Sequence, residues 1–151
     1  MLVTRTSLVN RYARHWVLTA RAEDIARWRC VVARSLQRQQ IATEGVELAC
    51  LGVSELLTNV ARHVADRRCR LAISCTAASV LLSVFDRSAE LPKVACPDWD
   101  AEQGRGLWLL REMAGREHLG ARPAAAPWRK EVWLRCVLRS DGSTKNVAES
   151  R

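Results

Sequence analysis

Two side chains one helical turn apart could handle a phosphorylated ligand. They lie in the stretch V-S-E-L-L-T-N, residues 53–59, where Glu55 and Asn59 are separated by four positions. At 100° per residue both would point to the same side of a helix, together with Gly52, whose missing Cβ permits close approach. A carboxylate can accept a proton and an amide oxygen can bind Mg²⁺, which suits phosphoryl transfer. Taken alone, such a pair is more often part of a solvated helix face.

Two further signals follow in order along the chain. Asp86 ends an apolar run and could accept a hydrogen bond from an adenine amino group. Gly104 and Gly106 flank Arg105 at the start of a helical pattern, where backbone N–H groups and the helix dipole favour phosphate. An Asp that starts a turn and a lone G-x-G are each common. The ordered combination of all three signals therefore carries the prediction of a nucleotide site.

The spacing of apolar residues predicts the elements that must position these groups. Val46, Val53, Leu57 and Val60 recur at helical spacing, and Thr43 could cap that helix. Apolar and small residues then alternate with period two, which favours an antiparallel hairpin. We expect strands at 15–20, 71–75, 80–85, 118–119 and 130–138, and helices at 24–39, 43–64 and 107–114. This order predicts an α+β fold, a two-layer sandwich.

Length and composition allow one domain with a real core. The chain has 151 residues, of which 48% are apolar. Residues 1–14 read as an N-terminal arm, 15–138 as the domain and 139–151 as a disordered tail. No apolar run is long enough for a membrane span or a secretory signal, so we expect a cytoplasmic protein. Residues 87–105 show no clear period and read as a long loop.

The net charge and the spacing of the cysteines indicate which partners to expect and whether disulfides or zinc sites are present. The net charge is +8, which would attract acidic partners, yet the arginines are spread along the chain, so direct nucleic-acid binding is not expected. No C-x-x-C spacing occurs among the six cysteines. We therefore expect buried reduced thiols at Cys30, Cys50, Cys75 and Cys136 rather than disulfides or zinc. Trp16, Trp28 and Trp133 fit core patterns.

Three motifs resemble those of a known superfamily. E-L-L-T-N-V-A-R-H at 55–63, V-F-D at 84–86 and G-R-G-L-W-L-L at 104–110 look like the N-box, G1 and G2 motifs of the histidine-kinase-like (GHKL) ATPases. More narrowly, the chain is similar to small stand-alone anti-sigma-factor serine kinases of the actinobacterial type. The resemblance covers about residues 15–138 and implies the Bergerat fold, with a mixed, mainly antiparallel sheet.

The resemblance also implies roles, cofactors and partners. Glu55 would be the general base, Asn59 would hold Mg²⁺, Asp86 would bind the adenine of ATP, and residues 87–103 would form a lid. The partners would be a sigma factor and its antagonist protein, with a homodimer left open. The residues expected on the phosphate side are Gly104, Arg105, Gly106 and Leu107.

One departure from the motifs leaves two functions open. Where the G1 motif carries D-x-G-x-G, this chain has Arg87, Ser88, Ala89 and Glu90 after the aspartate. Retention of Glu55 and Asn59 favours an ATP-dependent serine/threonine kinase that sequesters a sigma factor and phosphorylates its antagonist. The altered G1 motif favours a catalytically weak or inactive module of the same fold that binds nucleotide or a partner.

Overall fold

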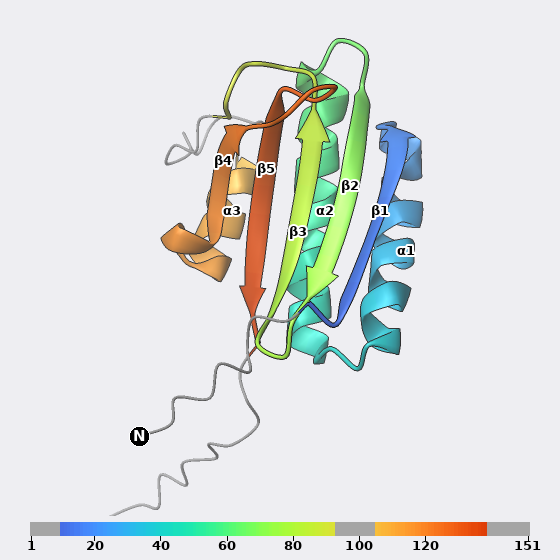
Figure 1. Ribbon diagram of the computed structural model, residues 1–151, viewed down its shortest axis with the longest axis vertical. Coiled ribbons are helices and arrows are strands. Elements are labelled where there is room, and N and C mark those ends of the chain that lie inside the picture. Colours follow the sequence, from blue (N-terminus) through green and yellow to red (C-terminus); the bar gives the residue numbers. More distant parts are fainter. Residues whose placement is uncertain (1–9, 93–104, 139–151) are drawn as a thin grey trace, which may run out of the picture.

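The computed structural model describes residues 10–92 and 105–138 and forms two layers, a five-stranded sheet and a helical layer on one of its faces (Figure 1). The strand order in the sheet is β1-β2-β3-β5-β4. Two short 3₁₀ turns, Ala22–Asp24 and Arg116–His118, accompany the main elements. These are β1 (Tyr12–Thr19), α1 (Ile25–Arg38), α2 (Thr43–His63), β2 (Arg68–Cys75), β3 (Ser79–Asp86), α3 (Arg105–Ala114), β4 (Leu119–Pro123) and β5 (Lys130–Val137).

The predicted order of elements and the α+β sandwich are confirmed. The β2–β3 hairpin is antiparallel, as the alternation of residues 71–75 predicts. The expectation of a mixed sheet is wrong, since all four pairings among the described strands are antiparallel. The reason is the connectivity: β5 returns beside β3 after α3 and β4, and runs opposite to both of its neighbours.

Inward and outward side chains alternate along the strands, and the inward ones form the core. Leu71, Ile73, Leu82 and Leu134 face the helices and are almost fully buried. Burying each such side chain contributes about 1.5–3 kcal/mol relative to leaving it exposed. The side chains between them point to the opposite face, which no described helix covers (Figure 1).

Helix α2 packs closely on the sheet at one glycine. A Cβ on Gly52 would overlap the side chains of Leu82 and Leu134, so the missing side chain allows the helix to approach β3 and β5. The close approach predicted at Gly52 is therefore found, but the approaching groups belong to the core. Helix α1 packs beside α2 and buries Val32 and Leu36 on its apolar stripe.

Several predicted boundaries differ from the structure: α3 begins at Arg105 rather than at Leu107, and β4 runs over Leu119–Pro123 rather than 118–119. Strand β1 begins at Tyr12 rather than at His15, because Tyr12 pairs with Cys75 and the full length of β2 is matched. Residues 1–9 of the predicted arm and the predicted tail, 139–151, lie outside the described residues. Thr43 is not a cap: it is the first residue of α2, which begins after Ala42 without a side-chain capping bond.

Two predicted core residues lie elsewhere. Cys30 is exposed because α1 buries the stripe that contains Val32 on another side. Trp133 is half-buried on the uncovered face of the sheet, since its neighbours Val132 and Leu134 take the inward positions of β5. The prediction holds for Trp16 and Trp28, whose rings lie 6.0 Å apart against the core.

Three of the cysteines behave as small buried hydrophobes. Cys69, Cys75 and Cys136 are buried and free, and Cys50 is partly buried. Burial raises the pKa of Cys69 and of Cys136 to about 12. Their thiols therefore stay protonated and unreactive at neutral pH.

Candidate functional site

A cavity of about 310 Å³ lies where the second half of α2, the start of α3 and the adjoining ends of β3 and β5 meet. Five of the residues predicted from the sequence to bind or act on a nucleotide line it: Glu55, Asn59, Asp86, Gly106 and Leu107. The structure thus brings together groups from three elements that are far apart in the chain. The apolar lining includes Leu56, Val60, Val84, Leu91, Pro92, Leu107 and Val132.

Glu55 is held against the start of α3. A Cβ built on Gly106 would overlap the Glu55 carboxylate, so only glycine permits this approach. Partial burial raises the pKa of the Glu55 carboxyl above its ordinary value, and the positive charge of Arg62 partly offsets the rise. A carboxylate with a raised pKa is a stronger base, which is what proton abstraction from a hydroxyl requires.

Asn59 lies one turn further along α2 and is also partly buried. Its amide can supply one oxygen ligand to Mg²⁺, which usually takes few protein ligands and completes its shell with phosphate and water. Within residues 10–92 and 105–138, no group of three His, Cys, Asp or Glu side chains could hold a metal ion. The donor set therefore fits a Mg²⁺ carried by phosphate oxygens rather than one caged by the protein.

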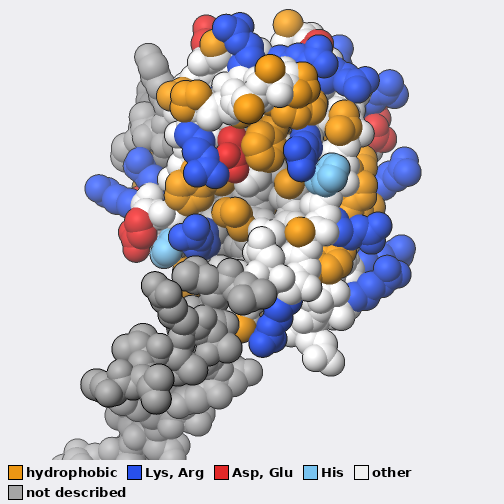
Figure 2. Space-filling model, in the orientation of Figure 1, with side chains coloured by type: hydrophobic (Ala, Val, Ile, Leu, Met, Phe, Trp, Pro, Cys, Tyr) orange, Lys and Arg blue, Asp and Glu red, His pale blue; other side chains and the backbone are white. Residues whose placement is uncertain are grey.

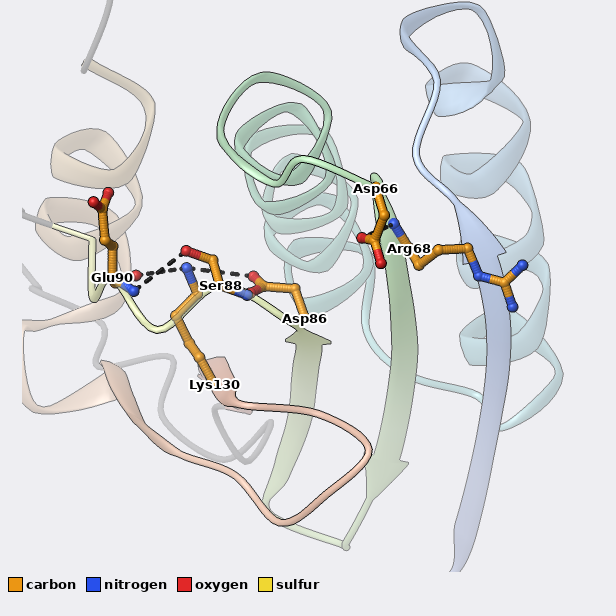
Figure 3. Close-up of polar contacts among 6 residues, drawn as sticks. All are labelled: Asp66, Arg68, Asp86, Ser88, Glu90 and Lys130. Carbon is orange, nitrogen blue, oxygen red and sulfur yellow. Dashed lines mark hydrogen bonds and ion pairs between the residues drawn. The ribbon is translucent and has the colours of Figure 1, made fainter.

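Asp86, at the end of β3, is 3% exposed and sits in a dense polar cluster (Figure 3). Its Oδ1 accepts a hydrogen bond from the Ser88 backbone N–H at 2.8 Å, and its Oδ2 lies 3.4 Å from the Lys130 Nζ. Burial raises the pKa of Asp86, while the Ser88 bond and the Lys130 charge pull it down. Asp86 thus presents a paired carboxylate to the cavity.

Lys130 is the residue of this site that the sequence did not single out. It is 7% exposed, and its ammonium also donates to the Glu90 carbonyl at 2.7 Å, which ties it to the segment after β3 (Figure 3). Lys130 is paired with Asp86 across the β3–β5 register. In the sequence, the sign of this residue was a charged side chain at the start of the final strand. Its place beside Asp86 follows from the strand register alone.

The structure describes only some of the remaining residues that were predicted to form the site. Arg105 begins α3, is exposed and is not among the residues that line the cavity. Gly104 and residues 93–103 of the predicted lid lie outside the described residues. In the described start of that segment, Ser88, Glu90, Leu91 and Pro92 line the cavity. His63, the last residue of α2, lines it as well.

The lining as a whole fits a nucleotide. Apolar side chains of β3, β5 and α3 can flank a flat base, while Asp86 offers an acceptor and Lys130 a donor beside it. At the start of α3, where Gly106 and Leu107 line the cavity, backbone N–H groups of a helix N-terminus can bind a phosphate chain.

Comparison with known proteins agrees with this geometry. A family model of the histidine kinase-like ATPase domain matches residues 18–135. The match spans well over half of the chain, so the protein belongs to the histidine kinase-like ATPase domain family. Family membership supports an ATP-binding regulatory role. No curated protein matches the chain significantly.

None of the described helices has both the length and the apolar character required to cross a membrane.

Proposed function

We propose that the protein is an ATP-dependent serine/threonine kinase that phosphorylates a partner protein. The observation that supports this proposal is the convergence of Glu55, Asn59, Asp86 and Gly106 on one cavity. These groups come from α2, β3 and α3, and each has one role in phosphoryl transfer from ATP. In the order given, they would serve as the general base, the metal ligand, the acceptor for the adenine amino group and the point of close phosphate approach.

In the proposed reaction, ATP is the substrate that donates its γ-phosphoryl group. Glu55 accepts the proton of the acceptor hydroxyl, a new serine O–P bond forms, and the bond from the γ-phosphorus to the leaving ADP oxygen breaks. Asn59 would hold Mg²⁺, which neutralises charge on the phosphate oxygens. The raised pKa of Glu55 favours its part in this reaction.

The base would be recognised by the Asp86–Lys130 pair. Adenine presents an amino donor next to the N1 acceptor, so Asp86 can accept from the amino group while Lys130 donates to the ring. Lys130 is held at the cavity wall by the Glu90 carbonyl, which limits the entropy lost on binding.

A second candidate is a binding module of the same fold that does not turn over ATP. Two observations favour it: the Ser88 N–H already occupies one Asp86 oxygen, and the Lys130 ammonium lies near the other. Both contacts compete with an adenine amino group for the carboxylate. The first contact involves the segment that departs from the G1 motif.

The partners we propose are a sigma factor, which the protein sequesters, and the sigma factor's antagonist, which carries the target serine. A cytoplasmic location belongs to this proposal, since transcription takes place there.

The proposal is tested by calorimetry and by phosphate transfer. Titration of the protein with ATP, with and without Mg²⁺, should show binding that Mg²⁺ strengthens. Purified protein with labelled MgATP and candidate antagonists from the same genome should place label on serine. Binding without transfer to any antagonist would favour the module, and no detectable heat at millimolar ATP would refute both the kinase and a nucleotide-binding module.

A further inference from the structure

The face of the sheet opposite the helices is strongly basic. It points toward the reader in Figure 2, where basic and hydrophobic side chains gather around a central hollow. The residues of this open face alternate along β2, β3, β4 and β5 with the buried residues of the core. Among the described residues of these strands, its charged members are Arg68, Arg70, Arg122, Arg135 and Glu131.

The guanidinium groups of two of these arginines lie over aromatic rings. One ring belongs to the neighbouring strand and the other to the same strand. The Arg70 guanidinium lies 5.4 Å from the centre of the Phe85 ring, and that of Arg135 lies 6.0 Å from the Trp133 ring. Such cation–π contacts restrict the long side chains before any partner arrives. A partner that binds them therefore loses less conformational entropy.

The one acidic member of the open face is already neutralised. Glu131 is 6% exposed, accepts a hydrogen bond from the Ser83 hydroxyl at 2.9 Å, and receives the Arg122 Nε at 2.6 Å. The Nε of Arg70 is buried and has no hydrogen-bond partner among the described residues. The charge of the open face is therefore mainly positive, and its carboxylate is already paired.

A hollow of about 250 Å³ lies beside Arg70 and Glu131, which both line it. It is lined by small side chains, those of Ala13, Ala72, Ser74 and Ser83, and by the apolar side chains of Leu81 and Phe85. Val17, which is 53% exposed, and Val137, which is 55% exposed, extend the apolar surface on two other strands. The hollow has room for one apolar side chain.

We propose that the open face is a docking site for an acidic polypeptide segment that inserts an apolar side chain into the hollow and places carboxylates on Arg70 and Arg135. Carboxylates would pair with guanidinium groups that the aromatic rings already position. The site lies on the opposite side of the sheet from the nucleotide cavity and does not depend on it.

The same observations argue against two other occupants. A second copy of the chain would oppose two such faces, each with four arginines and one glutamate, and like charges resist this pairing. Sites for single-stranded nucleic acid combine a basic groove with aromatic faces on which bases stack. Here the rings of Phe85 and Trp133 are the ones that the arginines cover.

The test is fluorescence anisotropy with a labelled peptide of about 12 residues in which leucine alternates with glutamate. Matched peptides replace glutamate by lysine, or leucine by serine. The acidic leucine peptide should bind the full chain tightest, with affinity that falls as salt rises. We expect roughly tenfold weaker binding for each of Arg70→Gln and Arg135→Gln. Arg34→Gln, an exposed change on α1 with the same loss of charge, should alter binding less than about twofold.

Several results would overturn the proposal. Equal losses in all three variants would show an effect of net charge alone, and equal binding of the serine peptide would remove the role of the hollow. Tighter binding of oligo-dT, lost in the same variants, would assign the face to nucleic acid. A dimer in sedimentation that Arg135→Gln dissociates would assign it to a second copy. Because the peptide changes need no protein variant, poor folding of a variant leaves the test intact.

Discussion

The two faces of the sheet are made by the same strands and carry opposite chemistry. On the helical face, Leu82 and Leu134 lie under α2, and Asp86 and Lys130 border the nucleotide cavity at one end. On the open face, arginines spread over aromatic rings around a shallow hollow. The difference shows that each strand encodes a core and a surface at alternate positions.

The comparison also separates the two kinds of recognition. The cavity combines carboxylate, amide and ammonium groups in a partly closed space, which suits a small ligand with donors, acceptors and a metal ion. The open face offers guanidinium donors over a wide area, which suits a polypeptide. Changes on one face should therefore leave the function of the other intact.

The largest expected effect is on phosphate transfer. Glu55→Gln keeps the size of the side chain but removes its basicity, so the rate should fall by about 10²–10⁴-fold while MgATP binding persists. Single-turnover transfer of labelled phosphate measures the rate, and calorimetry measures binding. The matched control is Glu47→Gln, an exposed change two turns earlier on α2, which should transfer at the normal rate. An equal rate in the Glu55 variant would show that Glu55 is only a polar surface residue.

The next largest effect is on the free energy of unfolding, and it should differ between two adjacent leucines of β3 that lie on opposite faces of the sheet. Leu82 is fully buried against α2, whereas Leu81 is partly exposed on the open face. Leu82→Ala should lower the free energy of unfolding by about 2–5 kcal/mol because it leaves a cavity in the core. Leu81→Ala should cost less than about 1 kcal/mol. Urea unfolding of both variants makes the comparison, and equal losses would mean that the open face is covered in solution.

The smallest effect concerns the pH dependence of transfer. A general base acts only when deprotonated, so the rate should fall as the pH falls through the pKa of Glu55. Burial raises that pKa and the charge of Arg62 lowers it. Arg62→Gln should therefore raise the pKa further and move the acid limb of the profile of kcat/KM to higher pH. The shift should be small because Arg62 is exposed, and Arg34→Gln should show none. A shift to lower pH would contradict this electrostatic account.

Local patterns in the sequence were sufficient for most of the fold. The helical spacing of Val46, Val53, Leu57 and Val60 predicts α2, and all four residues are buried. The alternation of Leu71 and Ile73 predicts a strand of the antiparallel hairpin. These signals are readable because a helix or strand buries one face at a period of 3.6 or 2, whatever the rest of the chain does. The same periods place Glu55 and Asn59 on one side of α2.

The tertiary structure alone decided which distant groups meet. The register of β3 and β5 sets Lys130 beside Asp86, and the packing of α3 sets Gly106 against Glu55, across 44 and 51 positions of the chain respectively. Trp133 points to the open face although a tryptophan is expected in the core. The strand register turns its neighbours Val132 and Leu134 inward instead. Such contacts depend on strand pairing and helix docking, which follow from the packing of the whole domain and leave no local period to read.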